Sequence, residues 1–171
     1  GCLNAPCTVS VSKETNQAAA TIQYENLRKM WSRMYAKSRN NAVWLINQDT
    51  EPQLHSISMP IGTGGVPVFL PPGGLSTSPY ASLFGRPVIP HESCATLGTV
   101  GDVILADYSQ YLAIEKGGMS SDSSIHVRFT TFETAFRFKY RYDAQPIWNS
   151  ALTPFKGTAT QSPFVTLATR A

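Results

Sequence analysis

The sequence is short of charged residues, and those it has are unevenly spread. Only 15% of its 171 residues are Asp, Glu, Lys or Arg, against about 25% in ordinary globular proteins. None of these four types occurs between Glu51 and Arg86, a gap of 34 residues. The net charge of +3 and the pI near 8.8 are too weakly basic to argue for nucleic-acid binding. Scarce charge leaves more neutral surface, which suits a protein that hides surface against neighbouring subunits.

Cysteine is also scarce, and long apolar runs are absent. Cys2, Cys7 and Cys94 are odd in number and lack the spacing of a metal site. We therefore expect free thiols in an intracellular protein. The sequence shows no signal-peptide pattern and no apolar run of the length that crosses a membrane. Because it begins at Gly1 in the middle of a pattern, we expect it to be a fragment of something longer.

The residues that usually carry catalysis do not form a convergent set. His91 and Cys94 are close in sequence, but three-residue spacing on a turn does not ensure that the imidazole reaches the thiol. Asp102 and Asp107 lie at opposite ends of one predicted strand, too far apart for a pair of catalytic carboxylates. We therefore expect no enzymatic activity, no cofactor and no metal. The histidines fall in different predicted elements and do not suggest a zinc site: His55, His91 and His126.

The most regular pattern lies at residues 83–118. Three short apolar runs are divided by Gly, Pro, Ser and Asp, which is typical of strands buried on both faces. Two further strands are expected near the ends of the sequence. The predicted strands are 87–90, 102–107 and 111–114 in this stretch, with 8–11 and 164–168 outside it.

Upstream of this stretch the pattern predicts a helix, a strand and a short helix. From 16 to about 39 the apolar residues recur at helical spacing, with Ile22, Leu27, Met30, Trp31 and Met34 near one face. We interpret this Met- and Trp-containing face as core-facing rather than as a ligand site. A buried strand follows at 42–47, and a short helix at 51–55 has Pro near its first turn. The expected N-caps are Thr15 or Asn16 for the first helix and Thr50 for the second.

The uncharged segment is rich in proline and glycine, with five of each at residues 58–79. A long uncharged loop that carries apolar side chains is an aggregation hazard in a monomer. We therefore predict that it packs on another subunit, with a small hairpin arm at 64–71. A phosphate-binding glycine loop is disfavoured, because the Gly-Lys-Ser/Thr ending and the following helix are missing. The interface candidates in this segment are Val66, Val68, Phe69, Leu70 and Leu75.

Apolar and polar residues alternate further along the sequence. After a polar turn at 117–124 the alternation covers 125–129 and resumes, one residue out of phase, at 132–142. Since a shift of one residue exchanges the two faces of a strand, Thr130 and Thr131 must form a turn or bulge. We predict a long, half-buried antiparallel strand at 132–142. Its basic face is either a subunit contact or solvated, with nucleic-acid contact as the alternative. It supplies three more interface candidates: Arg137, Lys139 and Arg141.

Two segments of the sequence resemble a known protein family. GRPV at 85–88 is followed, after a turn, by GDVILADYSQY at 101–111. This pattern resembles the late segment of tailed-bacteriophage major capsid proteins of the Hong Kong 97 type, and the order of elements agrees along nearly the whole chain. The resemblance implies an α+β fold in which two helices flank a mixed central sheet.

The resemblance also implies a domain organisation. Residues 1–171 are expected to form the axial domain of a capsid protein, together with a returning strand at about 125–142 that is shared with the peripheral domain. The N-terminal arm, the extended loop and most of the peripheral domain of such proteins are expected to be absent from this sequence.

The function implied by the resemblance is structural. Copies of a phage or prophage protein of this kind assemble in the bacterial host cytoplasm, through pentameric and hexameric capsomers, into an icosahedral virion shell. The shell encloses DNA without sequence-specific binding, and no membrane or small-molecule substrate is expected as a partner. One alternative is the shell of an encapsulin-like nanocompartment. The other is an uncharacterised enzyme or nucleic-acid-binding module.

Overall fold

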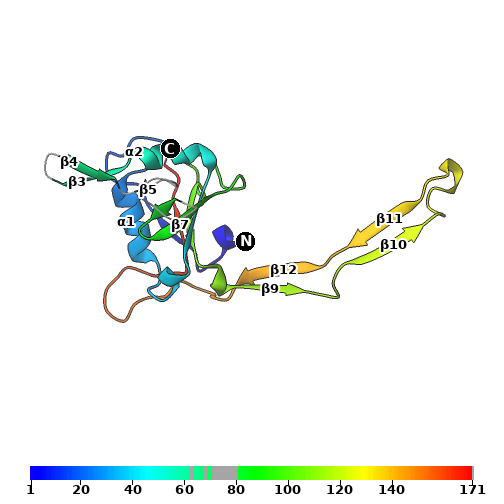
Figure 1. The fold of residues 1–171 in the computed structure, drawn as a ribbon. Helices are drawn as coiled ribbons and strands as arrows, with labels where there is room; N and C mark the ends of the chain where they lie inside the picture. Colours follow the sequence, from blue (N-terminus) through cyan, green and yellow to red (C-terminus); the bar gives the residue numbers. More distant parts are fainter. Residues whose placement is uncertain (62–63, 68, 71–80, 171) are drawn as a thin grey trace.

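A seven-stranded mixed sheet forms the centre of the molecule in the computed structural model, which describes residues 1–61, 64–67, 69–70 and 81–170 (Figure 1). Its strands lie in the order β1 (Val9–Val11), β13 (Phe164–Leu167), β8 (Val103–Ala106), β2 (Val43–Ile46), β7 (Arg86–Pro90), β6 (Ser82–Leu83) and β5 (Phe69–Leu70). β1 is parallel to β13 and β2 to β7, while the other neighbours are antiparallel.

The strands β8 and β13 are buried along their whole length. Both read as continuous apolar runs, VILA and FVTL apart from one threonine, as expected for strands covered on both faces. Their position beside one another explains why the sequence pattern here is the clearest in the chain. The structure confirms, within two residues at each end, the predicted strands at 8–11, 42–47, 87–90, 102–107 and 164–168.

The first helix is shorter than predicted. α1 covers Tyr24–Arg33 rather than 16–39, and its N-cap is Gln23 in place of Thr15 or Asn16. The cause is local competition for hydrogen bonds, since the Gln17 side chain donates to the Thr21 carbonyl and to Asn26 Oδ1, both at 2.8 Å. Side-chain bonds of this kind offer the backbone an alternative to the helix. The predicted core face is nevertheless correct, since it contains the buried Leu27, Met30 and Met34.

The second helix lies where it was predicted, with Thr50 at its N-cap position. α2 spans Glu51–Ser56, with Pro52 in its first turn, yet Thr50 makes no capping hydrogen bond. Asn47 instead accepts the Asp49 N–H at 3.0 Å and caps a preceding 3-10 turn. The short 3-10 segments are η1 (Cys2–Asn4), η2 (Ser38–Asn40), η3 (Gln48–Thr50), η4 (Tyr108–Gln110) and η5 (Phe129–Thr131).

The core is a single large cluster between the sheet and the helices, with a smaller one beside the N-terminal segment. Trp44 is fully buried, and its indole N–H donates to the Leu83 carbonyl at 3.1 Å. The polar end of this large side chain is therefore satisfied inside the core, as buried indoles require. The smaller cluster contains two buried thiols, Cys7 and Cys94, packed with Phe164.

The uncharged segment is organised differently from the prediction. β3 (Ser58–Ile61) pairs antiparallel with β4 (Gly64–Pro67), and β5 joins the main sheet beside β6. The predicted hairpin at 64–71 is therefore wrong, because its first half pairs with residues upstream of it. The side chains of residues 58–80 lie outside the part of the chain that the structure describes.

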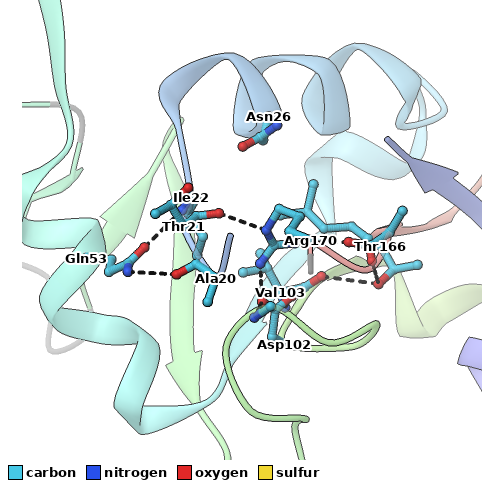
Figure 2. A network of polar contacts seen from close by, with 12 residues as sticks. Ala20, Thr21, Ile22, Asn26, Gln53, Asp102, Val103, Thr166 and Arg170 are labelled. Carbon is cyan, nitrogen blue, oxygen red and sulfur yellow. Dashed lines mark hydrogen bonds and ion pairs between the residues drawn. The ribbon is translucent and has the colours of Figure 1, made fainter. Parts of the chain in front are cut away.

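A buried ion pair ties the end of the chain to the turn before β8. Arg170 and Asp102 are both fully buried, and the guanidinium donates to the carboxylate (Figure 2). Asp102 also accepts the N–H groups of Gly98 at 2.9 Å and of Val103 at 2.8 Å. The Arg170 side chain donates further to the Thr21 carbonyl at 2.8 Å. The charges are therefore both paired and hydrogen-bonded, as buried charges must be.

A long two-stranded ribbon projects from the body of the molecule (Figure 1). Near the body β9 (Tyr111–Glu115) pairs with β12 (Tyr142–Pro146), and farther out β10 (Ser120–Ser124) pairs with β11 (Ala135–Lys139). The ribbon corrects three predictions. The strand at 111–114 is not buried on both faces, residues 120–124 are a strand rather than a polar turn, and residues 125–129 are not a strand.

The predicted long strand at 132–142 is also corrected. It is reduced to β11, a break, and the beginning of β12, and its residues are mostly exposed rather than half-buried. The predicted turn at Thr130 and Thr131 is confirmed, since η5 reverses the chain there.

Tyr108, at the junction between the body and the ribbon, has a raised pKa. The Tyr108 ring lies edge-on to Phe164, with 6.5 Å between ring centroids, and burial together with the neighbouring Cys2 raises the pKa of Tyr108 to about 12. The unfolded chain loses this proton near pH 10. Protonated Tyr108 therefore contributes in full to the free energy of unfolding below about pH 10, and this contribution is lost as the pH rises through about 12.

We expect Tyr108→Phe to reduce the loss of unfolding free energy between about pH 9 and 12, measured by urea denaturation. Burial raises the pKa of Cys7 and Cys94 as well. The unfolding free energy of the variant should therefore still fall with pH, but with a smaller slope. Identical slopes for the variant and the unmodified chain would contradict this assignment.

Candidate subunit interface

The register of the ribbon determines which side chains share a face. Residues directly opposite one another in an antiparallel pair lie on the same side, so Tyr142 and Glu115 share one face, as do Phe138 and Ser121. The phenol of Tyr140 donates to Glu115 Oε2 at 2.7 Å, which places Tyr140 on that face too. We call this side of the ribbon the aromatic face. Its aromatic residues are Tyr111, Phe136, Phe138, Tyr140 and Tyr142.

The aromatic face is exposed in the single chain. Phe136 is 71% exposed and Phe138 is 67% exposed, and the rings of Tyr140 and Tyr142 stack with 6.2 Å between centroids without becoming buried. At its inner end the face continues into the body, where Tyr111 packs against Phe164. A contiguous row of exposed aromatic rings is unusual for a monomer and is typical of interaction surfaces.

The tip of the ribbon adds a second apolar patch. Phe132 is 99% exposed and has a left-handed backbone (φ 56°). Arg128 and Glu133 close the turn with an ion pair of 2.8 Å. A hollow of about 210 Å³ lies at the tip, lined by Ile125, Phe129, Phe132, Glu133 and Thr134.

The opposite side of the ribbon, which we call the charged face, contains the three basic interface candidates. Arg137 forms an ion pair of 2.7 Å with Asp122, the residue directly opposite, and this guanidinium lowers the pKa of the Asp122 carboxyl. Lys139 lies opposite Ser120, and Arg141 lies beside Lys116. The prediction that Arg137, Lys139 and Arg141 share a face is therefore confirmed. Their role in a subunit contact stays a prediction.

The other predicted interface residues belong to the uncharged segment. Nothing is described for the side chains of Val66, Phe69 and Leu70, and Val68 and Leu75 lie outside the described residues altogether. Among the described side chains, the structure therefore brings together the three basic members of the predicted set.

The aromatic face was only partly predicted. The alternation predicted at 132–142 implies that Phe136, Phe138, Tyr140 and Tyr142 share one side, but the strand was expected to be half-buried rather than exposed. Ser120 was missed as a member of the charged face because residues 117–124, which include β10, were assigned to a polar turn, and Lys116 was missed because it lay between that turn and the predicted strand at 111–114. The paired glycines that follow Lys116 are the signal that marks the bend of the ribbon there.

The residues considered for catalysis do not converge on one another. His91 is exposed, and its Nδ1 accepts the Ser93 N–H at 3.1 Å, while Cys94 is buried and burial raises the pKa of its thiol. A thiol with a raised pKa is a poor nucleophile near neutral pH. Asp102 and Asp107 lie at the two ends of β8, as predicted, and Asp107 accepts the Ser109 N–H at 3.0 Å.

The described residues contain neither a metal-ligand cluster nor a membrane-spanning helix. Across residues 1–61, 64–67, 69–70 and 81–170, no group of three or more His, Cys, Asp or Glu side chains is placed to hold a metal ion. None of the described helices has the length and apolar character needed to span a bilayer.

The chain has relatives among solved structures. It is similar over its full length to a chain described as the capsid of an empty GTA (gene transfer agent) particle computed with C5 symmetry, with a TM-score of 0.65, 16% identity and 56% of that chain covered. A chain from the capsid of the native GTA particle, also computed with C5 symmetry, is matched over 95% of this chain and 50% of that one, with a TM-score of 0.60 and 17% identity. The chain thus spans about half the length of these proteins.

These structures establish the predicted fold, in which two helices accompany a mixed central sheet. A comparison with curated protein sequences found no match. The sequence pattern of the Phage capsid family matches residues 1–157, and that family is structural rather than enzymatic, in agreement with the prediction for this chain. Sequence and fold therefore agree, and the chain belongs to the Phage capsid family.

Proposed function

We propose that this chain is part of a major capsid protein whose copies assemble into the shell of a phage head or a phage-like particle. The observation that carries the proposal is the aromatic face of the ribbon, which extends from the core into solvent and is exposed in the single chain. Family membership over residues 1–157 supports the same function.

Self-association follows from the same proposal. The two similar capsid structures were computed with C5 symmetry, which supports fivefold capsomers for this chain. We extend this to pentamers and hexamers in one closed shell that encloses DNA without reading its sequence. The proposed location is the virion, after assembly in the cytoplasm of the bacterial host.

We further propose that the body and the ribbon belong to different parts of the subunit. The seven-stranded sheet with α1 and α2 corresponds to the axial domain, which lines the capsomer axis. The ribbon, residues 111–146, corresponds to strands shared with the peripheral domain. Its length and its distance from the sheet in Figure 1 support this division. It replaces the returning strand at about 125–142 by a pair of strands with a turn between them.

The uncharged segment at 58–79 is proposed to reach the capsomer axis, where five or six copies meet. Like charges repeated around one axis would repel, and this segment has none. Five prolines also lower the entropy lost when such a segment becomes ordered.

Phe69→Asp tests this proposal. We expect the substitution to leave the isolated chain folded but to block capsomer formation by the natural-length protein, because it places five or six carboxylates around one axis. Circular dichroism reports the fold, and light scattering reports assembly. Phe69→Leu is the matched control and should assemble. If Phe69→Asp assembled normally, the segment would not line the axis.

A further inference from the structure

A hollow at the bend of the ribbon has the composition of an anion site. It has a volume of about 230 Å³, against about 30 Å³ per molecule in liquid water, so it has room for a small ion and its hydration. It lies on the charged face where β9 passes to β10. It is lined by Lys116, Gly117, Gly118, Ser120, Lys139 and Arg141, which include three cations and no carboxylate.

The three cations of this hollow, Lys116, Lys139 and Arg141, form no ion pair with any described residue. The nearby acids are otherwise engaged. Asp122 pairs with Arg137, and Asp143, which lines a neighbouring hollow with Lys116 and Arg141, accepts the Ala144 N–H at 2.8 Å.

Three further polar groups in the hollow are unsatisfied among the described residues. The Ser120 hydroxyl oxygen is buried and has no hydrogen-bond partner, although buried hydroxyls are normally paired. In the part of the chain that the structure describes, the N–H groups of Gly117 and Gly118 donate to no acceptor. Both glycines have positive φ, 79° and 62°, so a conformation that other residues rarely adopt forms the bend.

We propose that this hollow binds a phosphate group, held by Lys116, Lys139 and Arg141 and by the hydroxyl of Ser120. Cations and unpaired donors with no carboxylate among them suit a phosphate, because it offers acceptor oxygens and negative charge. The group is either a phosphodiester of DNA or a free phosphate or pyrophosphate ion. The site belongs to this chain alone and does not depend on the proposed capsid function.

The test measures binding to the 171-residue chain at low ionic strength, because exposed charges are screened by salt. Calorimetry with pyrophosphate reports the free ion, and fluorescence anisotropy with a labelled DNA oligonucleotide reports the phosphodiester. We expect at least one probe to bind, and Lys139→Gln to weaken it about tenfold. Lys156→Gln removes an exposed lysine outside the ribbon and should leave binding unchanged.

Ser120→Ala separates a ligand-binding role from a structural one. Removing an unpaired buried hydroxyl should leave the melting temperature unchanged or raise it when no anion is present. With pyrophosphate or DNA, whichever binds, the rise in melting temperature should be smaller for this variant than for the unmodified chain.

Three results would overturn the proposal. These are the absence of binding to both probes, equal binding by Lys139→Gln and Lys156→Gln, and a carboxylate probe such as citrate that binds as tightly as pyrophosphate. The last would assign the hollow to an acidic partner. Binding of DNA without pyrophosphate, or of pyrophosphate without DNA, supports the proposal and identifies the source of the phosphate.

Discussion

Replacing Arg170 by methionine should lower the free energy of unfolding by about 3–5 kcal/mol, because it leaves the Asp102 carboxylate buried without its partner. Globular domains of this size are stable by only about 5–15 kcal/mol, so this loss would be a large share of the total. Urea denaturation followed by circular dichroism measures the change.

A matched control is available on α1. Arg28 forms an exposed ion pair of 2.5 Å with Glu25, and Arg28→Met should cost less than about 1 kcal/mol. The double variant Asp102→Leu with Arg170→Met should recover part of the loss, since both charges are then gone. It should not recover all of it, because the Gly98 and Val103 N–H groups lose their acceptor. A loss of less than 1 kcal/mol for Arg170→Met would contradict the burial of this pair.

Replacing Phe136 and Phe138 together by serine should abolish assembly of the natural-length protein while leaving the isolated chain as stable as before. Both rings are largely exposed in the single chain, so their removal costs little there. If a shell covers them, each contributes roughly 1.5–3 kcal/mol of apolar burial per subunit, repeated at every copy. Size-exclusion chromatography and urea denaturation measure the two effects separately.

Phe155→Ser is the matched control for this pair. Phe155 is 100% exposed but lies in the loop between β12 and β13, away from the ribbon. We expect this variant to assemble. If it fails to assemble as well, a general loss of exposed apolar surface is the cause. If the Phe136 and Phe138 variant forms normal shells, the aromatic face is not an assembly surface.

The strands of the body could be predicted from sequence because each is a short apolar run closed by turn residues. β8 is the clearest example, since the run from Val103 to Ala106 is buried at every position. α1 was overestimated because helical periodicity continues beyond the residues whose side chains allow a helix. At its N-terminal side, Gln17 and Asn26 bond to each other, and the helix begins only at Tyr24.

The ribbon shows what periodicity does not determine. Alternation identified which aromatic residues share a face, but burial depends on what covers that face, and no pattern within the strand reports this. β10 was missed for a different reason. Its sequence, Ser-Ser-Asp-Ser-Ser, has little strand preference and becomes a strand because it pairs with β11. The Asp102–Arg170 pair joins residues far apart in sequence and leaves no local signal.

The most direct test of the proposed function is electron cryo-microscopy of the protein that carries this sequence, expressed at its natural length. The proposal predicts closed particles of uniform size, in which the body lines the capsomer axis and the aromatic face of every ribbon is covered by other parts of the shell. Discrete small oligomers, or closed particles in which Phe136 and Phe138 remain in solvent, would contradict it.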